Sequence, residues 1–235
     1  KYVDNVWHAT KVSFANEIGR ICKPLMINSH KVMDVFVQDT KLNLSPYYLK
    51  PGFAYGGSCL PKEVRAVHHL ASTLGVETPL ISSLPKTNNI QIDEATKLIR
   101  KTGGRKIGFL GLAFKAGTDD LRESPILEVL NTLIEEGFEV SAYDPAIRAD
   151  TRVNNQFDYV RHVCPHLEPT VRALPDLLRQ NVHQLVDECD VVVATQHTSE
   201  FQTVVASRLG RHQVVDLVHL FSETPGIDGY HGIGW

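Results

Sequence analysis

The residue with the clearest potential for chemistry is Cys59, which follows two glycines and stands just before a predicted helix over 61–74. Glycine permits close backbone approach or a positive φ angle, and Pro61 is a favoured first residue of a helix. The free N–H groups at a helix N-terminus, with Lys62 nearby, favour a thiolate at this position. A small buried cysteine is the plain alternative, but the glycine loop and the helix start argue against it. The pattern therefore predicts a nucleophilic thiol.

A polar line runs along the first predicted helix and is formed by Lys1, Asn5 and His8. At 100° per residue these side chains share one arc of the helix, which Val12 and Gly19 also occupy. Spacing alone favours a solvated face. The apolar and small residues on the same arc instead suit a face against which something packs, so both interpretations stay open.

A polar loop with basic residues follows the first predicted strand of the chain's second half. Two residues separate Gly108 from Gly111, so these glycines do not form the G-x-G-x-x-G dinucleotide fingerprint. Lys115 and Arg122 come next, just before a helix start at Ser124. Positive side chains and free N–H groups at the carboxyl end of a strand suit a phosphate group. A polar loop with a surface arginine is an equally good interpretation.

Composition narrows the classes of function. The 235 residues include 24 Lys and Arg against 27 Asp and Glu, a net charge of −3. This near balance argues against a nucleic-acid-binding protein, which usually has a basic excess. Hydrophobic residues at 43% and charged residues at 22% are typical of a globular protein. No apolar run reaches the roughly 18 residues of a membrane-spanning helix.

Cysteine usage indicates a reducing compartment. The four cysteines are widely spread and form no C-x-x-C pair: Cys22, Cys59, Cys164 and Cys189. This pattern predicts free thiols in a cytoplasmic protein, with neither a disulfide framework nor a metal site. The chain starts without an apolar signal-peptide region. It also starts inside a predicted helix without a start signal, which leads us to expect a piece of a longer protein.

The first half of the chain is predicted to be helical. Apolar residues recur at helical spacing, and Pro or Gly closes most of the segments. The predicted helices cover 1–24, 29–40 with Ser29 as a possible N-cap, 61–74 and 79–101, with a loop over 41–60. The fourth helix carries Ile and Leu on an arc wider than a small domain covers, which predicts an interface and a homodimer.

After Gly104 the pattern changes to alternating strands and helices. Strands are predicted over 106–114, 139–143 and 213–217, and a helix is predicted over 124–136. The segment 185–194 is predicted to be the end of a helix followed by a strand. Strand–helix–strand alternation implies a parallel sheet with right-handed crossovers. The predicted fold class is α/β, with an all-helical domain over 1–103 followed by a parallel-sheet domain over 104–235.

Three segments together resemble the nucleotide-sugar 6-dehydrogenases, the UDP-glucose and GDP-mannose dehydrogenase family. They are K-x-x-x-N at 1–5, PGFAYGGSCLPKE at 51–63 and GLAFKAGTDDLRESP at 111–125. Asn43, Tyr47 and Tyr48 make the chain more similar to the GDP-mannose branch, because the UDP-glucose branch usually has arginine at position 43.

The resemblance implies the second and third of the family's three domains. These are a central helical dimerisation domain over 1–103 and a C-terminal Rossmann-like nucleotide-sugar-binding domain over 104–235. The family's first domain, which binds NAD, would end just before Lys1, and the chain has no candidate for the NAD fingerprint. The chain alone is therefore expected to be inactive.

The resemblance also implies a reaction, the four-electron oxidation of a sugar C6 alcohol to a carboxylate with two NAD. Cys59 would attack the intermediate aldehyde and carry a thioester, while Lys1 and Asn5 would stabilise the oxyanion. A carboxylate would activate water, and where the family has Asp this chain has Glu63. The extra methylene matters, since a shift of about 1 Å in a catalytic group is enough to slow a reaction.

The resemblance also implies which further residues bind ligands. His8, Tyr55 and Lys115 would contact the sugar or its phosphates, and Arg122 would meet the NAD pyrophosphate. Four residues would reach the substrate of the other protomer in a homodimer: Asn43, Tyr47, Tyr48 and Lys50. Lysine at position 50, where some relatives have arginine, keeps the charge but loses the planar fork. GDP-mannose is the favoured substrate, and alginate-like polymers are the expected destination of the product.

Other classes of function stay open. The chain could be a dimerisation and nucleotide-sugar-binding module without chemistry, or its substrate could be UDP-glucose. A cysteine hydrolase would need a histidine base beside Cys59. His68 and His69 are candidates, but neither lies in a recognisable cysteine–histidine signature.

Overall fold

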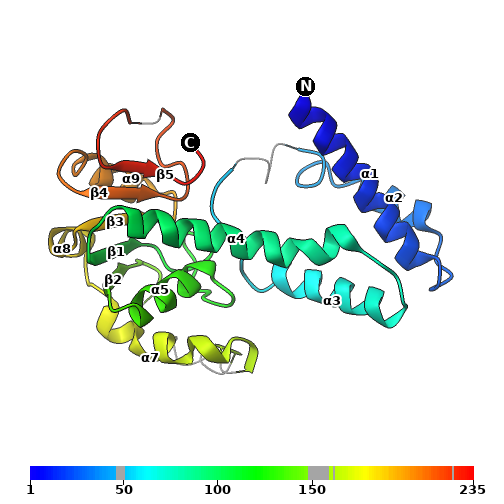
Figure 1. Ribbon diagram of the computed structural model, residues 1–235, viewed down its shortest axis with the longest axis horizontal. Helices are drawn as coiled ribbons and strands as arrows, with labels where there is room; N and C mark the ends of the chain where they lie inside the picture. The colour runs from blue at the N-terminus through cyan, green and yellow to red at the C-terminus, as the bar shows by residue number, and fades with distance from the viewer. Residues whose placement is uncertain (46–50, 148–158, 161, 224) are drawn as a thin grey trace. The chain divides into compact units, whose positions relative to one another are not determined.

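The computed structural model describes residues 1–45, 51–147, 159–160, 162–223 and 225–235 (Figure 1). Its contacts divide the chain into two compact units, a helical unit of residues 1–51 and 61–87 and a sheet unit of residues 52–60 and 88–235. Helices come first and a parallel sheet follows, which confirms the predicted fold class. The domain boundary expected at Gly104 stays a prediction.

The described residues of the helical unit form four helices, the last of which continues into the sheet unit. They are α1 (Tyr2–Cys22), α2 (Ser29–Phe36), α3 (Leu60–Thr73) and α4 (Pro79–Lys101). The four predicted helices are thus confirmed. A small core of Ile21, Ala71 and Ile81 holds α1, α3 and α4 together. No helix in the described part of the chain is both long and apolar enough to cross a membrane.

A buried carboxylate fixes the start of α4. Glu17 on α1 is only 3% exposed. Its two oxygens accept hydrogen bonds from the backbone N–H groups of Leu80 and Ile81, at 2.7 and 3.0 Å. The first N–H groups of a helix have no partner within the helix, and negative charge is favourable there. Glu17 therefore ties α1 to the N-terminus of α4.

The second helix starts at the predicted residue, but its N-cap and its C-terminal end differ from the prediction. Its N-cap is Asn28 rather than Ser29, because the Asn28 side chain accepts from the N–H groups two and three residues on, at 3.0 and 3.3 Å. The helix ends at Phe36 rather than at residue 40. The Asp39 carboxylate accepts hydrogen bonds from the backbone N–H groups of Lys41 and Leu42, at 3.0 and 2.9 Å. These bonds favour a tight turn and stop the helix from continuing.

The sheet unit contains five parallel strands in the order β2-β1-β3-β4-β5. They are β1 (Lys106–Leu110), β2 (Glu139–Tyr143), β3 (Val191–Ala194), β4 (Gln213–Asp216) and β5 (Tyr230–Gly232). The predicted parallel sheet is confirmed, and β2 has the predicted bounds.

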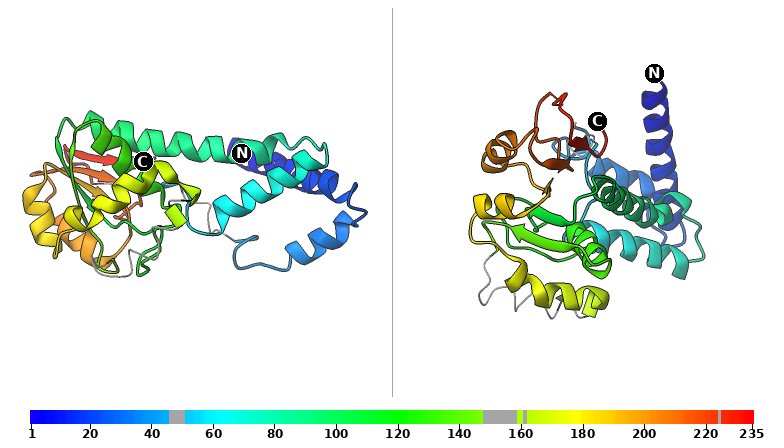
Figure 2. Two further views of the ribbon diagram at one scale, coloured as in Figure 1. Left: turned by 90° about the horizontal axis from the view of Figure 1, so that it is seen from below. Right: turned by 60° about the vertical axis from the view of Figure 1, so that its left-hand side comes forward.

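Alternate side chains of the strands point to opposite faces, and each face has its own helical layer. Ile107 and Phe109 of β1 pack in one core with the C-terminal half of α4, α5 (Pro125–Glu135) and α7 (Glu168–Leu177). Leu110 packs in the other core with α8 (Val182–Glu188) and α9 (Ser199–Ala206). Figure 2 shows α4 and α9 on opposite sides of the sheet.

The first strand is shorter than predicted, ending at Leu110 instead of residue 114. Gly111 has φ +105°, and a Cβ there would lie 2.6 Å from Gln196 side-chain carbons. The N–H groups of Leu112 and Ala113 then bind the Asp144 side chain rather than a neighbouring strand. The residues after Gly111 thus form a loop at the carboxyl edge of the sheet.

Among the described residues, four elements have no counterpart in the sequence prediction: the 3-10 helix η1 (Pro165–Leu167), α7, α9 and β5. α7 contains Pro175, which argues against a helix in sequence reasoning. β5 has three residues and includes a glycine, so it carries almost no periodic signal. Tertiary packing on the sheet stabilises these elements where local sequence does not indicate them.

Candidate active site

Cys59 is exposed and is the residue directly before α3. This confirms the helix start predicted after it. Gly57 has φ +86°, a conformation that glycine adopts readily. The Ser58 hydroxyl lies 3.8 Å from the Cys59 sulfur. The thiol therefore stands at the end of a tight glycine turn and is open to a reactant.

The loop that carries Cys59, residues 52–60, is docked on the segment before α5. The Gly57 N–H donates to the Glu123 carbonyl at 3.3 Å. A Cβ on Gly56 would overlap that carbonyl and Pro125, and one on Gly57 would lie 2.8 Å from the Phe114 ring. Only glycine fits at these two positions, so the backbone can lie flat against the sheet unit.

Arg122 is held by Asp120 on the same segment. Its Nε and Nη2 donate to the two carboxylate oxygens at 2.8 and 2.7 Å, a bidentate pair. This hydrogen-bonded arginine lowers the pKa of Asp120, and the same bond raises the pKa of Arg122. Tyr159 and Cys59 add smaller contributions that also raise the pKa of Arg122. A fixed positive charge thus lies on the segment against which the Cys59 loop docks.

A buried acid organises the carboxyl edge of the sheet. Asp144, which follows β2, is 3% exposed. One of its oxygens accepts from the N–H groups of Leu112 and Ala113 and from the Gln196 side-chain amide, at 2.8, 3.1 and 3.0 Å. It therefore holds together the loops that follow β1, β2 and β3.

The strand order marks the position where a ligand is expected in the sheet unit. β1 and β3 are neighbours, yet the chain passes from β1 to β2 on one side before it returns to β3 on the other. In an open parallel sheet, the crevice outside the carboxyl ends at this reversal is the usual ligand site. The Cys59 loop and the Arg122 segment belong to the same unit as this crevice.

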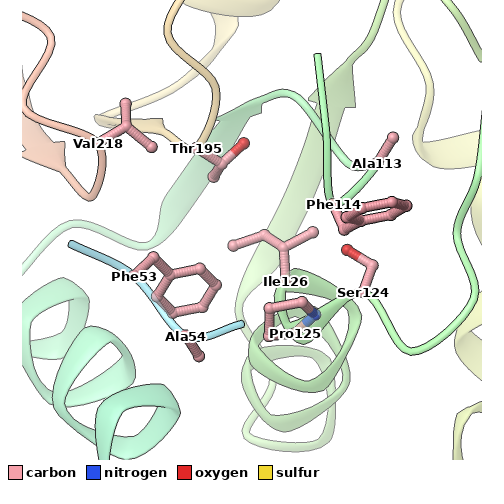
Figure 3. A pocket seen from close by; sticks show the side chains of 9 residues that line it. All are labelled: Phe53, Ala54, Ala113, Phe114, Ser124, Pro125, Ile126, Thr195 and Val218. Carbon is pink, nitrogen blue, oxygen red and sulfur yellow. The ribbon is translucent and has the colours of Figure 1, made fainter. Parts of the chain in front are cut away.

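A pocket of about 200 Å³ lies at this edge, next to the Cys59 loop (Figure 3). Side chains after three strands, from the start of α5 and from the Cys59 loop line it: Phe53, Ala54, Ala113, Phe114, Ser124, Pro125, Ile126, Thr195 and Val218. Pockets for a complete small-molecule ligand are usually 300–1,000 Å³ in volume. This pocket therefore suits one part of a larger ligand.

The sequence-predicted site residues divide between the two units. Cys59, Tyr55, Lys115 and Arg122 belong to the sheet unit. Tyr55 is half-buried and Lys115 is exposed. The structure thus brings the predicted thiol and the predicted phosphate-binding loop together in one unit.

The other predicted site residues belong to the helical unit or lie outside the described residues. Lys1 is exposed at the start of α1, and Asn43 donates from its side chain to the Phe36 carbonyl at 3.3 Å. Asn5 and His8 lie in α1, but their side chains fall outside the description, as do Tyr47, Tyr48 and Lys50 altogether. The roles expected for these residues stay predictions.

Glu63 lies in the first turn of α3 and pairs with Lys62 at 3.1 Å. Both side chains are more than 60% exposed, so the pair is a weak one. The carboxylate is therefore free to change partners, and its role in activating water stays a prediction. Among the described residues, no three His, Cys, Asp or Glu side chains form a group that could hold a metal ion.

The predicted site residues did not include Asp120, Asp144 or Asn88, whose side-chain amide bonds the backbone N–H and carbonyl of Tyr55 at 2.9 Å each. Asn88 occupies a position in the apolar repeat of its helix, where a polar side chain that competes for backbone bonds is unusual. Asp144 follows a strand and precedes a proline, a position where side chains of an α/β sheet often bind ligands or loops. Sequence spacing alone gives no sign that Asp120 would hold Arg122.

Two family models match the chain. The central domain of the UDP-glucose/GDP-mannose dehydrogenase family matches residues 1–90, and the UDP binding domain of the same family matches residues 108–223. The chain belongs to this family. The predicted resemblance is thereby confirmed.

The relatives within this dehydrogenase family favour one branch. The chain is 42% identical to GDP-mannose 6-dehydrogenase of Pseudomonas putida over 236 residues, which cover 100% of the chain and 52% of the relative. It is 32% identical to UDP-glucose 6-dehydrogenase TuaD of Bacillus subtilis, covering 100% of the chain and 49% of that protein. The chain spans about half the length of the curated relatives it matches.

A solved structure agrees with this family assignment. The crystal structure of a ternary complex of GDP-mannose dehydrogenase from Pseudomonas aeruginosa matches with a TM-score of 0.88 and 43% identity. The match covers 100% of this chain and 52% of that one. The order of helices and strands described above is therefore a fold of this dehydrogenase family.

Proposed function

We propose that this chain supplies the nucleophilic cysteine and the nucleotide-sugar site of a GDP-mannose 6-dehydrogenase. The observation that carries the proposal is the exposed Cys59 on a glycine loop docked beside Arg122, at the carboxyl edge of a parallel sheet. The match of residues 108–223 to a UDP binding domain supports nucleotide-sugar binding by the same unit. The higher identity to GDP-mannose enzymes supports the branch.

In the proposed reaction, the C6 alcohol is first oxidised to an aldehyde. The Cys59 sulfur attacks the aldehyde carbon, a C–S bond forms, and the carbonyl oxygen takes a proton to give a thiohemiacetal. Loss of a hydride from C6 and a proton from the hydroxyl gives a thioester. Water then adds to the carbonyl, the C–S bond breaks, and Cys59 leaves as a thiolate while a carboxylate remains.

Further residues of the chain would support these steps. Lys1 and Asn5 would donate to the oxygen that becomes negative when sulfur or water attacks. Glu63 would accept a proton from the attacking water. His8, Tyr55 and Lys115 would bind the sugar and its phosphates. These assignments follow the family pattern, and each is open to single-residue substitution.

NAD is the oxidant that the family implies, and when bound it accepts a hydride in each of the two oxidations. The residue of this chain that would meet its pyrophosphate is Arg122. A guanidinium has five N–H donors, so the two held by Asp120 leave others for phosphate oxygens. The Arg122 side chain is 43% exposed and within reach of a ligand. The donor set therefore fits a pyrophosphate.

A homodimer formed through the helical unit completes the proposal. Large apolar side chains are exposed on this unit, among them Met26 at 91%, Val35 at 68% and Leu44 at 53%. Exposed apolar patches usually mark an interface. Asn43, Tyr47, Tyr48 and Lys50 would then reach the substrate of the partner. Light scattering at micromolar concentration tests this, and a monomer would contradict it.

The decisive test of the chemistry is Cys59→Ser in the protein that carries this chain. Acid formation from GDP-mannose, followed by mass spectrometry, is expected to fall below detection, because a serine hydroxyl is a poor nucleophile at neutral pH. Cys164→Ser is the matched control and is expected to keep activity. Unchanged turnover in Cys59→Ser would refute the thioester route and favour a binding module without chemistry.

The substrate branch needs its own measurement. We expect kcat/KM for GDP-mannose to exceed that for UDP-glucose by about tenfold or more. A site whose polar groups match one substrate usually discriminates by at least this much against a substrate that leaves them unpaired. Oxidation of both nucleotide sugars, each followed by NADH absorbance, gives the ratio. A ratio below one would assign the chain to the UDP-sugar branch. The sugar acid produced would suit an alginate-like polymer made from a cytoplasmic precursor.

A further inference from the structure

One turn of α4 contacts the loop that carries Cys59. Asn88 and Gln91 lie three residues apart, so their side chains point from the same face of the helix. The Asn88 side-chain amide donates to the Tyr55 carbonyl at 2.9 Å and accepts from the Tyr55 N–H at 2.9 Å. The Gln91 amide donates to the Gly52 carbonyl at 2.5 Å.

These bonds replace the secondary structure that the loop lacks. Residues 51–56 belong to neither a helix nor a strand, so their backbone groups have no regular partners. Buried backbone N–H and C=O groups need partners, and Tyr55 is only partly exposed. The Asn88 amide matches both groups of Tyr55 at once, as a neighbouring strand would. It thereby fixes the backbone four residues before Cys59.

The other end of the loop is fixed by a different element. The Gly57 N–H is bound to the Glu123 carbonyl at 3.3 Å. Glu123 itself has φ +48°, an uncommon conformation for a residue with a side chain, and it directs this carbonyl at the loop. Asn88 and Glu123 therefore fix the backbone on both sides of Gly56, just before Cys59.

We propose that Asn88 is a positioning residue for the Cys59 thiol. The inference rests on the proposed function, because it assumes that the thiol reacts with substrate. Glycine-rich backbone is the most flexible kind and loses the most freedom when ordered. Without the two hydrogen bonds between Asn88 and the Tyr55 backbone, the segment 52–57 samples other conformations. The Cys59 sulfur then spends less time at the position from which it attacks.

The test compares Asn88→Ala and Asn88→Asp with Asn89→Ala. Asn89 is the next residue on α4 and is exposed, so it provides a matched control. We expect Asn88→Ala to lower kcat about tenfold or more, since a displacement of about 1 Å can cost up to about a hundredfold. KM for GDP-mannose should change less than kcat, because Asn88 contacts the backbone of Tyr55 rather than the ligand itself. Asn88→Asp keeps the hydrogen-bond acceptor and loses the donor, so its kcat should lie between those of the wild type and Asn88→Ala.

Alkylation of Cys59 gives a readout independent of oxidation. Iodoacetamide labelling, followed by peptide mass spectrometry with Cys164 as internal reference, is expected to change in rate at Cys59 in Asn88→Ala, because a released loop presents the exposed sulfur differently. The rate should be unchanged in Asn89→Ala. A purely structural role for Asn88 would lower the melting temperature and the yield, but not kcat per titrated Cys59 thiol.

The proposal is overturned if Asn88→Ala and Asn89→Ala share the same kcat per titrated thiol and the same rate of Cys59 alkylation. If Asn88→Ala does not fold, Asn88→Asp decides by the same two measurements. Full turnover in Cys59→Ser would remove the proposed function, while the alkylation rates would still show whether Asn88 positions the thiol.

Discussion

At the scale of single residues, the site depends on hydrogen-bond partners, some close in sequence and some distant. Cys59 gains its setting from Gly56, Gly57 and a docked carbonyl, while Arg122 gains its orientation from Asp120. Sequence spacing identified Cys59 and Arg122 as candidates from their positions near helix starts. It did not identify Asp120 or Asn88, because a hydrogen-bond partner leaves no periodic signal.

The Asp120–Arg122 pair predicts a pH dependence of stability. Arg122 lowers the pKa of Asp120 in the folded state. The pair therefore contributes stability above the ordinary aspartate pKa of about 3.9, and this contribution is lost as pH falls through the lowered folded value. We expect Asp120→Asn to cost under about 1 kcal/mol at pH 7, because the arginine is partly exposed and screened.

Urea unfolding of both proteins between pH 3 and 7 checks this. The difference between wild type and Asp120→Asn should shrink as the solution becomes more acidic, and Asp119→Asn at the neighbouring carboxylate is the comparison. A difference that stays constant down to pH 3 would contradict the pairing.

The different surroundings of Cys59 and Cys189 predict that their thiols react at very different rates. Cys59 is exposed, whereas Cys189 is buried and its burial raises the pKa of the thiol to about 12. A raised pKa keeps the thiol protonated, so Cys189 should resist iodoacetamide at pH 8 while Cys59 is labelled. Peptide mass spectrometry separates the two, and Cys189 should become reactive only in denaturant. Labelling of Cys189 before Cys59 in the native protein would contradict this assignment.

At the scale of elements, short irregular segments carry the candidate site and regular elements hold them. The loop after β1 is organised by Asp144, and the Cys59 loop is held by α4 and by the segment before α5. Helices and strands with strong periodicity could be predicted because the signal is repeated many times. The docking of one loop on another could not, since it depends on single contacts.

Gly57→Ala tests the fit of the Cys59 loop. A side chain at φ +86° costs about 1–2 kcal/mol, and its Cβ would also lie 2.8 Å from the Phe114 ring. We expect the loop to move and kcat to fall severalfold. Gly103→Ala is the matched control, because Gly103 has φ +78° but no atom within 4 Å of a Cβ. Equal kcat in the two variants would show that Phe114 does not constrain the loop.

At the scale of the whole molecule, the chain combines a helical unit and a sheet unit that carry different parts of the proposed site. The sheet unit holds Cys59, Tyr55, Lys115 and Arg122, and the helical unit holds Lys1, Asn43 and Glu63. The chain covers about half the length of the relatives it matches.

The sequence also predicts whether the 235-residue chain is active by itself. Its sequence contains no G-x-G-x-x-G strand–turn–helix for a dinucleotide, so we expect no NADH from GDP-mannose and NAD. Absorbance of NADH measures this, and circular dichroism shows whether the chain is folded. Measurable turnover by the folded chain would show that NAD binds without the fingerprint.

The sequence by itself determined the α/β class, the four N-terminal helices, the parallel sheet, the family and the candidate thiol at Cys59. These features follow from periodicity and from short motifs, whose physical cause is local backbone geometry and the burial of one face. Only the tertiary structure showed that Asn88 fixes Tyr55, that Asp120 holds Arg122 and that Asp144 joins three loops. The contacts of Asn88 and Asp144 join segments distant in sequence, so they form only after packing brings these segments together. The Asp120–Arg122 contact is local, but it depends on the side-chain orientations that the folded loop sets.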